Sequence, residues 1–157
     1  MTALVCVGRI RERSARALAD EYIKRIGRYT AIEEIETRDL PEPARLTNVE
    51  IERVLNIEGE ALLRHVKPAD TLVALTPGGK RMTSEAFAEW YAKANAGSGR
   101  LCFAVGGSMG LSGAVFARTS ERLSLSDMTL PHALARIVLL EQIYRACKIN
   151  ANERYHK

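Results

Sequence analysis

The stretch LCFAVGGSMGLS, residues 101–112, joins a short apolar run directly to a glycine-rich turn. The run Leu101–Val105 is typical of a buried β-strand, and a short helix is expected after Ser112. Glycine-rich turns after strands bind ligands in many α/β proteins, because backbone N–H groups and a helix N-terminus can converge there. The stretch therefore predicts a strand that leads into a ligand site.

Outward from this stretch, apolar runs alternate with segments of helical period along the whole chain. Helices are expected over residues 14–26, after Thr47, after Thr83, after Ser112 and from His132 onward. Strands are expected over residues 3–8, from 31, and over 71–75, 101–105 and 122–126. The alternation predicts an α/β fold, with a mainly parallel sheet of five or six strands and helices on both faces.

Length and composition set the class of protein. With 157 residues, the chain predicts a single domain over 1–157. Its net charge of +4 suits a polyanionic partner and equally suits an ordinary, slightly basic enzyme. The three cysteines stand in apolar settings without paired spacing, which predicts buried free thiols. Neither a signal peptide nor a membrane span is recognisable, so a cytoplasmic location without membrane contact is expected.

The last predicted helix, HALARIVLLEQIYRACKI, is apolar nearly all round its axis. Such a helix is buried on more than one side, which a small domain seldom achieves. Burial against a second copy of the chain explains the pattern and predicts a homodimer. A fully internal helix is the alternative.

Several kinds of site are excluded by their motifs. The first strand ends in VGRIRER and lacks the GxGxxG of dinucleotide sites, and TPGGKR lacks the spacing of a P-loop. The three histidines lie far apart, so no metal site is expected. GGSMG does not match the nucleophile elbow of serine hydrolases. There remain three strand ends, ALTPGG, AVGGSMG and SLSDMTLPH, at the edge where open parallel sheets bind ligands.

Here the sequence resembles a known family. VGGSMGLS, LSLSDMTLPHALARIVLLEQIYRA and the terminal ANERYHK are similar to the bacterial ribosomal RNA large-subunit methyltransferase H family. The pieces VGR, EYIKRI and NIEGEALL extend the resemblance over essentially the whole chain. The family belongs to the SPOUT superfamily and methylates N3 of pseudouridine 1915 in helix 69 of 23S rRNA.

The resemblance implies a C-terminal trefoil knot, a homodimer and S-adenosylmethionine as cofactor. The knot and cofactor region would span about 71–157, with the cofactor in the loops after Leu75, Val105 and Ser124. The positions that match the family's cofactor contacts are Leu75, Gly106, Leu125, Ser126, Asp127, Met128, Thr129 and Leu130. Without the family motif, the leucines would be interpreted as ordinary core residues. Ser108 and Met109 replace a Pro or Ala and an acidic residue that are common in the family.

Three residues are candidates for catalysis. His132, directly after the expected cofactor loop, is the first candidate for a general base, and otherwise begins or packs the last helix. Tyr155 and His156 are second candidates that could reach the partner's site across a dimer, or belong to a solvated tail. The candidate RNA contacts are Arg136, Arg145, Arg154 and Lys157, with Arg9, Arg11 and Arg13 as a second basic cluster.

The expected activity is S-adenosylmethionine-dependent methylation of rRNA in the assembled ribosome, because no separate RNA-binding domain is evident. Two alternatives stay open at this point. One is a SPOUT methyltransferase with a tRNA substrate. The other is a non-catalytic dimer that binds S-adenosylmethionine or RNA.

Overall fold

The computed structural model of the chain describes residues 1–42, 45 and 47–155. Its centre is a five-stranded sheet with the strand order β2-β1-β4-β3-β5. Every strand pairing within the described residues is parallel, which confirms the expected sheet. The strands are β1 (Thr2–Val7), β2 (Ile32–Thr37), β3 (Thr71–Lys80), β4 (Leu101–Val105) and β5 (Arg122–Leu123).

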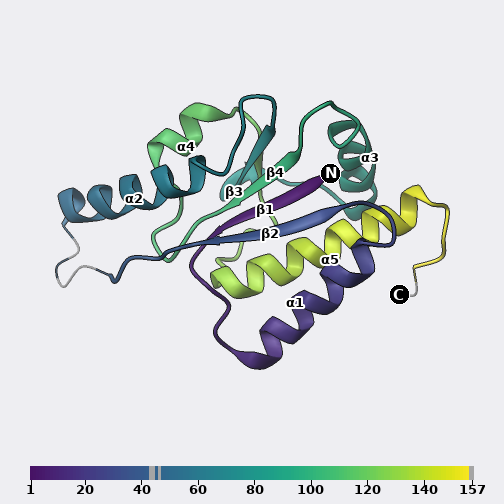
Figure 1. Cartoon of the computed structure of the whole chain (residues 1–157), viewed down its shortest axis with the longest axis horizontal. Helices are drawn as coiled ribbons and strands as arrows, with labels where there is room; N and C mark the ends of the chain where they lie inside the picture. The colour runs from purple at the N-terminus through teal and green to yellow at the C-terminus, as the bar shows by residue number, and fades with distance from the viewer. Residues whose placement is uncertain (43–44, 46, 156–157) are drawn as a thin grey trace.

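Helices cover both faces of the sheet (Figure 1). One face carries α1 (Arg13–Ile26), α3 (Ser84–Ala94) and α5 (His132–Asn150), and the other carries α2 (Asn48–Leu63) and α4 (Gly113–Arg118). Helices begin after Thr47, Thr83 and Ser112, as expected, and each of these side chains accepts a backbone N–H of the helix that follows. The alternation of strands and helices thus follows the order that the sequence predicts.

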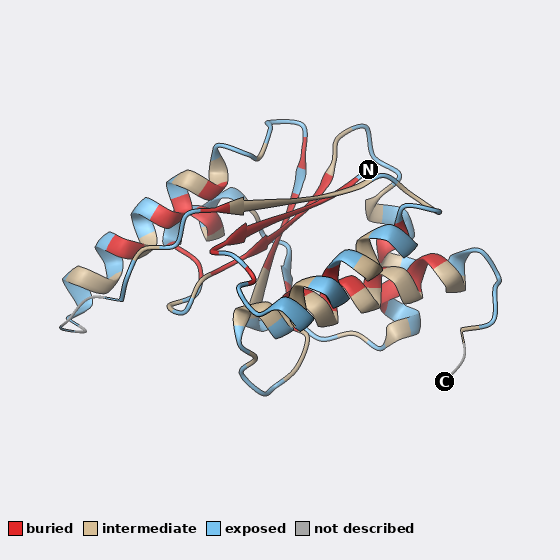
Figure 2. Ribbon diagram, turned by 60° about the horizontal axis from the view of Figure 1, so that its bottom comes forward, coloured by how far each residue is buried: buried red, intermediate tan, exposed pale blue. Residues whose placement is uncertain are grey.

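Alternate side chains of the strands supply two separate cores. In β1, Leu4 and Cys6 face α1, α3 and α5, whereas Val5 faces α2 and α4. Figure 2 shows β1 and β4 as continuously buried strands, whereas the edge strand β2 is of intermediate burial over most of its length. All three cysteines are free and buried, as expected, and burial raises the pKa of Cys6 and of Cys102 to about 12.

The last helix, α5, lies between α1 and α3 against the sheet. Leu139, Leu140, Ile143 and Ala146 are all fully buried within one chain. The alternative of an internal helix therefore accounts for most of the apolar surface that favoured a dimer. Near the start of α5, Leu134 remains 45% exposed. The homodimer itself stays a prediction.

Two strands near the carboxyl edge differ from expectation. β5 covers only Arg122–Leu123, because the residues that follow leave the sheet and form a loop. β3 continues to Lys80 with a register shift, so that Leu123 pairs with both Leu75 and Lys80. A Cβ at Gly79 would lie 2.5 Å from the carbonyl carbon of Leu123, so the 75–80 segment closes tightly around β5. None of the described helices has the length and apolarity needed to cross a membrane.

Candidate functional site

Three loops converge at the carboxyl edge of the sheet and enclose a cavity of about 780 Å³. The first begins at Leu75, where β3 stops pairing with β4, and the other two follow β4 and β5. The first turns of α4 and α5 complete the wall. The lining residues are Leu75, Thr76, Pro77, Val105, Gly106, Gly107, Ser108, Met109, Gly110, Leu111, Phe116, Ser124, Leu125, Ser126, Met128, Thr129, Leu130, Pro131, His132 and Ala135. A cavity of this size with mixed apolar and polar walls suits a small organic ligand.

The loop after β4 makes a sharp turn that depends on its glycines. The N–H of Gly110 donates to the carbonyl of Gly107 at 3.1 Å, and the two residues form an isolated bridge. Gly110 has φ +91°, which L side chains rarely adopt. A Cβ at Gly106 would lie 2.2 Å from the Gly110 carbonyl oxygen. The turn therefore folds back on Gly106 and sets one wall of the cavity.

The loop after β5 is held by its own serines. Ser124 Oγ donates to the Ser126 carbonyl at 2.9 Å, and Ser126 Oγ accepts the N–H of Met128 at 2.9 Å. The N–H of Ser124 also donates to the carbonyl of Lys80, at 3.0 Å, which ties this loop to the end of β3. These bonds replace the strand that was expected to continue to residue 126, and they turn the loop toward the cavity.

Seven of the eight residues expected to contact a cofactor line the cavity, whereas Asp127 does not. The Asp127 carboxylate forms an exposed ion pair with Arg81. Met128 is 78% exposed, so it lies at the rim of the cavity instead of forming an inner wall. The remaining positions come from all three loops: Leu75, Gly106, Leu125, Ser126, Thr129 and Leu130.

His132 is the first residue of α5 and lines the cavity. Burial lowers the pKa of its imidazole, and the nearby positive charge of Arg136 lowers it further. Its Nδ1 atom is buried and has no hydrogen-bond partner among the described residues. The lowered pKa favours a neutral ring near pH 7, and a neutral imidazole can accept a proton.

Arg136 was predicted to contact RNA, and this prediction is wrong because the side chain is not accessible. Its side chain is fully buried, and its guanidinium donates to the carbonyls of Val7, at 3.0 Å, and Gly8. It also forms ion pairs with Glu36, at 2.9 Å, and Glu34, at 3.4 Å. A signal for this burial was present in the sequence, since Arg136 precedes Leu139 and Leu140 at helical spacing on the apolar stripe.

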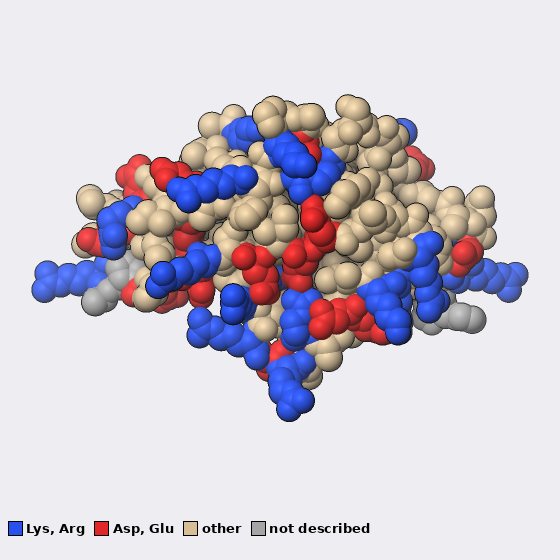
Figure 3. All heavy atoms as spheres, in the orientation of Figure 1, with Lys and Arg blue, Asp and Glu red and all other residues tan. Residues whose placement is uncertain are grey.

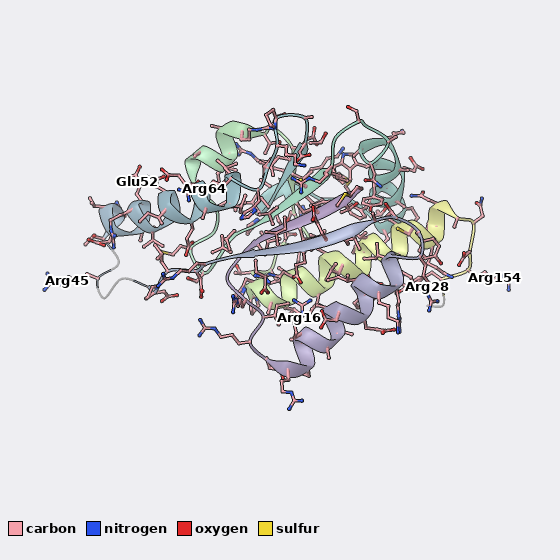
Figure 4. The ribbon with its side chains drawn as sticks, in the orientation of Figure 1. Arg16, Arg28, Arg45, Glu52, Arg64 and Arg154 are labelled. Atoms are coloured by element: carbon pink, nitrogen blue, oxygen red, sulfur yellow. The ribbon has the colours of Figure 1, made fainter. Side chains whose placement is uncertain are left out.

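The remaining described candidates lie from the middle of α5 onward. Tyr155 donates its hydroxyl to Glu141 at 2.8 Å, and Arg145 stacks on its ring with 4.0 Å between guanidinium and centroid. Burial and the Glu141 carboxylate raise the pKa of Tyr155 to about 12. Arg154 is exposed and points away from the body of the protein (Figure 4). His156 and Lys157 lie outside the described residues.

The structure thus separates two groups of predicted catalytic residues. His132 and Asn150 bound α5, which spans about 27 Å at 1.5 Å per residue. Within one chain, the Tyr155 hydroxyl is bound to Glu141, about 14 Å along α5 from His132, and Tyr155 does not line the cavity. Among the described residues, no group of three or more His, Cys, Asp or Glu side chains could hold a metal ion.

Known proteins are similar to this chain over nearly its whole length. The family model described as "Predicted SPOUT methyltransferase" matches residues 1–156. Two relatives named ribosomal RNA large subunit methyltransferase H, from Exiguobacterium sibiricum and Bifidobacterium animalis subsp. lactis, are 41% and 43% identical over 98% of both chains. A third with that name, from Clostridioides difficile, is 42% identical over 99% of this chain and 98% of its own. Lpg2936 from Legionella pneumophila, solved with bound SAM, superposes with a TM-score of 0.47 and 16% identity, over 90% of this chain and 64% of its own.

Proposed function

The chain belongs to the SPOUT methyltransferase family, and on that premise we propose that it methylates N3 of a pseudouridine in helix 69 of 23S rRNA. The enzyme class and the ribosomal RNA substrate are those named for relatives that match nearly the full chain. The observation that carries the proposal is the cavity, where residues from all three predicted loops meet His132.

The residues around the cavity fit S-adenosylmethionine. Leu75, Leu125 and Leu130 offer apolar surface to an adenine ring, while Ser126 and Thr129 add polar groups. Gly106 lines the same cavity and packs directly against the backbone of Gly110, so this part of the wall is formed by backbone without a side chain. When bound, S-adenosylmethionine supplies a methyl group on a positively charged sulfur. We propose that these six residues hold it and that Met128 covers it from the rim.

The chain's own groups then have two tasks. The three loops must hold the nucleoside in line with the methyl group and keep water out, because alignment supplies much of the rate enhancement. The N3 proton must also be removed, and the neutral imidazole of His132 is placed to accept it. Asp127 lies outside the lining and pairs with Arg81, so the proposal gives it neither task.

A homodimer forms part of the proposal. The Tyr155 hydroxyl is bound to Glu141, about 14 Å along α5 from His132, and Tyr155 does not line the cavity, so the tail of one chain would serve the cavity of its partner. His156 would follow Tyr155 into that site. Arg145, Arg154 and Lys157 would accompany them as contacts to RNA phosphates. We further propose a trefoil knot within about 71–157, which the closure of the 75–80 segment around β5 supports.

The substrate is proposed to be the assembled ribosome in the cytoplasm. Transfer of labelled methyl from S-adenosylmethionine is measured on three substrates in parallel: 70S ribosomes that lack the modification, free 23S rRNA and bulk tRNA. Label on ribosomes alone is expected. Label on tRNA would overturn the proposed ribosomal substrate. Cofactor binding without methyl transfer to any of the three substrates would favour a non-catalytic sensor.

A further inference from the structure

A second hollow, of about 530 Å³, lies at the carboxyl ends of β1 and β2. It is lined by Arg9, Arg11, Glu36, Thr37, Arg38 and Asp39, which are together named the basic groove. Three arginines against two carboxylates leave it with a net positive charge. Figure 3 shows basic side chains standing out along the lower edge of the molecule, where the segment between β1 and α1 runs in Figure 1.

The backbone under the groove is fixed. The N–H of Gly8 donates to the Thr37 carbonyl at 2.9 Å, and the N–H of Ile10 donates to Glu36 Oε1 at 3.2 Å. Buried Arg136 holds the same turn through the carbonyls of Val7 and Gly8. Ile10 is buried, so its neighbours Arg9 and Arg11 project to the opposite side, into the groove. The two guanidinium groups thus start from a rigid base.

These guanidinium groups are only weakly engaged. The side chains of Arg9 and Arg11 are both 82% exposed. Arg9 lies 3.9 Å from Glu36, and Arg11 lies 3.4 Å from Asp39. Arg38 is exposed and forms no ion pair with any residue that the structure describes. Since exposed ion pairs contribute little stability, all three arginines are free to turn toward an external anion.

The groove adjoins the proposed active site. The charges of Asp39 and Arg11 both act on the imidazole of His132, which lines the cavity. Arg136, one helical turn beyond His132, anchors the turn that carries Arg9. A chain that lies along the groove therefore leads to His132 and into the cavity.

We propose that the basic groove binds the sugar-phosphate backbone of the RNA substrate beside the nucleotide that enters the cavity. The inference rests on the proposed function, which supplies an RNA substrate. Guanidinium groups bind phosphate through two parallel hydrogen bonds, and contacts of this kind fix the position of RNA without reading its sequence. Arg9, Arg11 and Arg38 are positioning residues in this account.

The test compares two double variants of equal net charge. In R9Q/R11Q the groove loses two charges, and in the control R28Q/R64Q two exposed arginines far from it are changed (Figure 4). Co-sedimentation with 70S ribosomes is measured across a range of salt concentrations, together with kcat and KM for methyl transfer and calorimetric binding of S-adenosylhomocysteine. In R9Q/R11Q we expect KM to rise about tenfold or more, and the salt slope to fall by about one for each arginine. Binding of S-adenosylhomocysteine stays unchanged, and the control behaves as wild type.

Each other outcome is decisive. A wild-type KM and a wild-type salt slope in R9Q/R11Q would overturn the proposal that the groove binds RNA. Weaker sedimentation with an unchanged salt slope would indicate a protein surface as the partner, which also overturns an RNA contact. If the wild-type protein sediments with ribosomes in an arginine-dependent manner but methylates none of them, the groove stands and the proposed function fails. Adding Arg38→Gln to R9Q/R11Q should weaken sedimentation further.

Discussion

Gly106→Ala tests whether the turn after β4 shapes the cofactor site. The added Cβ would lie 2.2 Å from the carbonyl oxygen of Gly110 and 2.4 Å from its carbonyl carbon, whereas an ordinary contact needs 3.4 Å or more. Both colliding atoms are backbone, so no side chain can rotate away. The turn must therefore move by about 1 Å, a shift typical of overpacking that costs about 1–3 kcal/mol.

That shift displaces a wall of the cavity, so we expect the affinity for S-adenosylhomocysteine to fall by about tenfold to a hundredfold, at about 1.4 kcal/mol for each factor of ten. Isothermal titration calorimetry measures this loss, and thermal unfolding monitored by circular dichroism shows whether the fold is kept. Gly113→Ala is the matched control, because a Cβ at Gly113 meets nothing within 4 Å. Wild-type affinity in Gly106→Ala, or an equal loss in both variants, would refute the reasoning.

Three further predictions concern titratable side chains. His132→Gln should lower kcat by about 10²–10⁴-fold and remove the acid limb of the pH profile, which in the wild-type protein lies below the ordinary value of 6.5; an intact limb in the variant would exclude His132 as the base. Asp70→Asn should cost about 3 kcal/mol in denaturant unfolding, because it breaks the buried pair with Arg100. Burial opposes ionisation of Asp70, but hydrogen bonds from Arg100 hold its pKa below 3.8, so the difference from wild type should shrink as pH falls below that value, and a constant difference would contradict this. Glu58→Gln should stabilise the fold at pH 7 but not below pH 4.5, because burial raises the pKa of Glu58. The same difference in unfolding free energy between variant and wild type at both pH values would contradict this prediction.

Much of the fold follows from local patterns. Thr47, Thr83 and Ser112 cap the helices that the sequence predicts, since capping depends only on residues a few positions apart. The apolar run of β4 ends where the glycines begin. The strand order β2-β1-β4-β3-β5 could not be predicted in this way, because it depends on how each crossover packs.

In the candidate site, too, features that depend on local sequence were predicted, and features that depend on other contacts were not. Seven of eight cofactor positions line the cavity, because the family motif and the strand ends mark the same loops. The predicted RNA contact of Arg136 was wrong. The carbonyls that bind its guanidinium, those of Val7 and Gly8, lie more than a hundred residues away in the chain, so local sequence does not reveal them. β5 was expected to be longer, because hydrogen bonds between serine side chains and the backbone compete with a strand in ways that an apolar pattern does not reveal.

The most direct test of the central claim is to identify the methylated nucleoside. Ribosomes that lack the modification are incubated with the protein and S-adenosylmethionine, and the helix 69 fragment of 23S rRNA is digested and analysed by mass spectrometry. We predict one added methyl group, on N3 of a pseudouridine, and its loss in the Gly106→Ala variant at limiting cofactor. A methyl group on another nucleoside, or an unmodified fragment despite bound cofactor, would contradict the account.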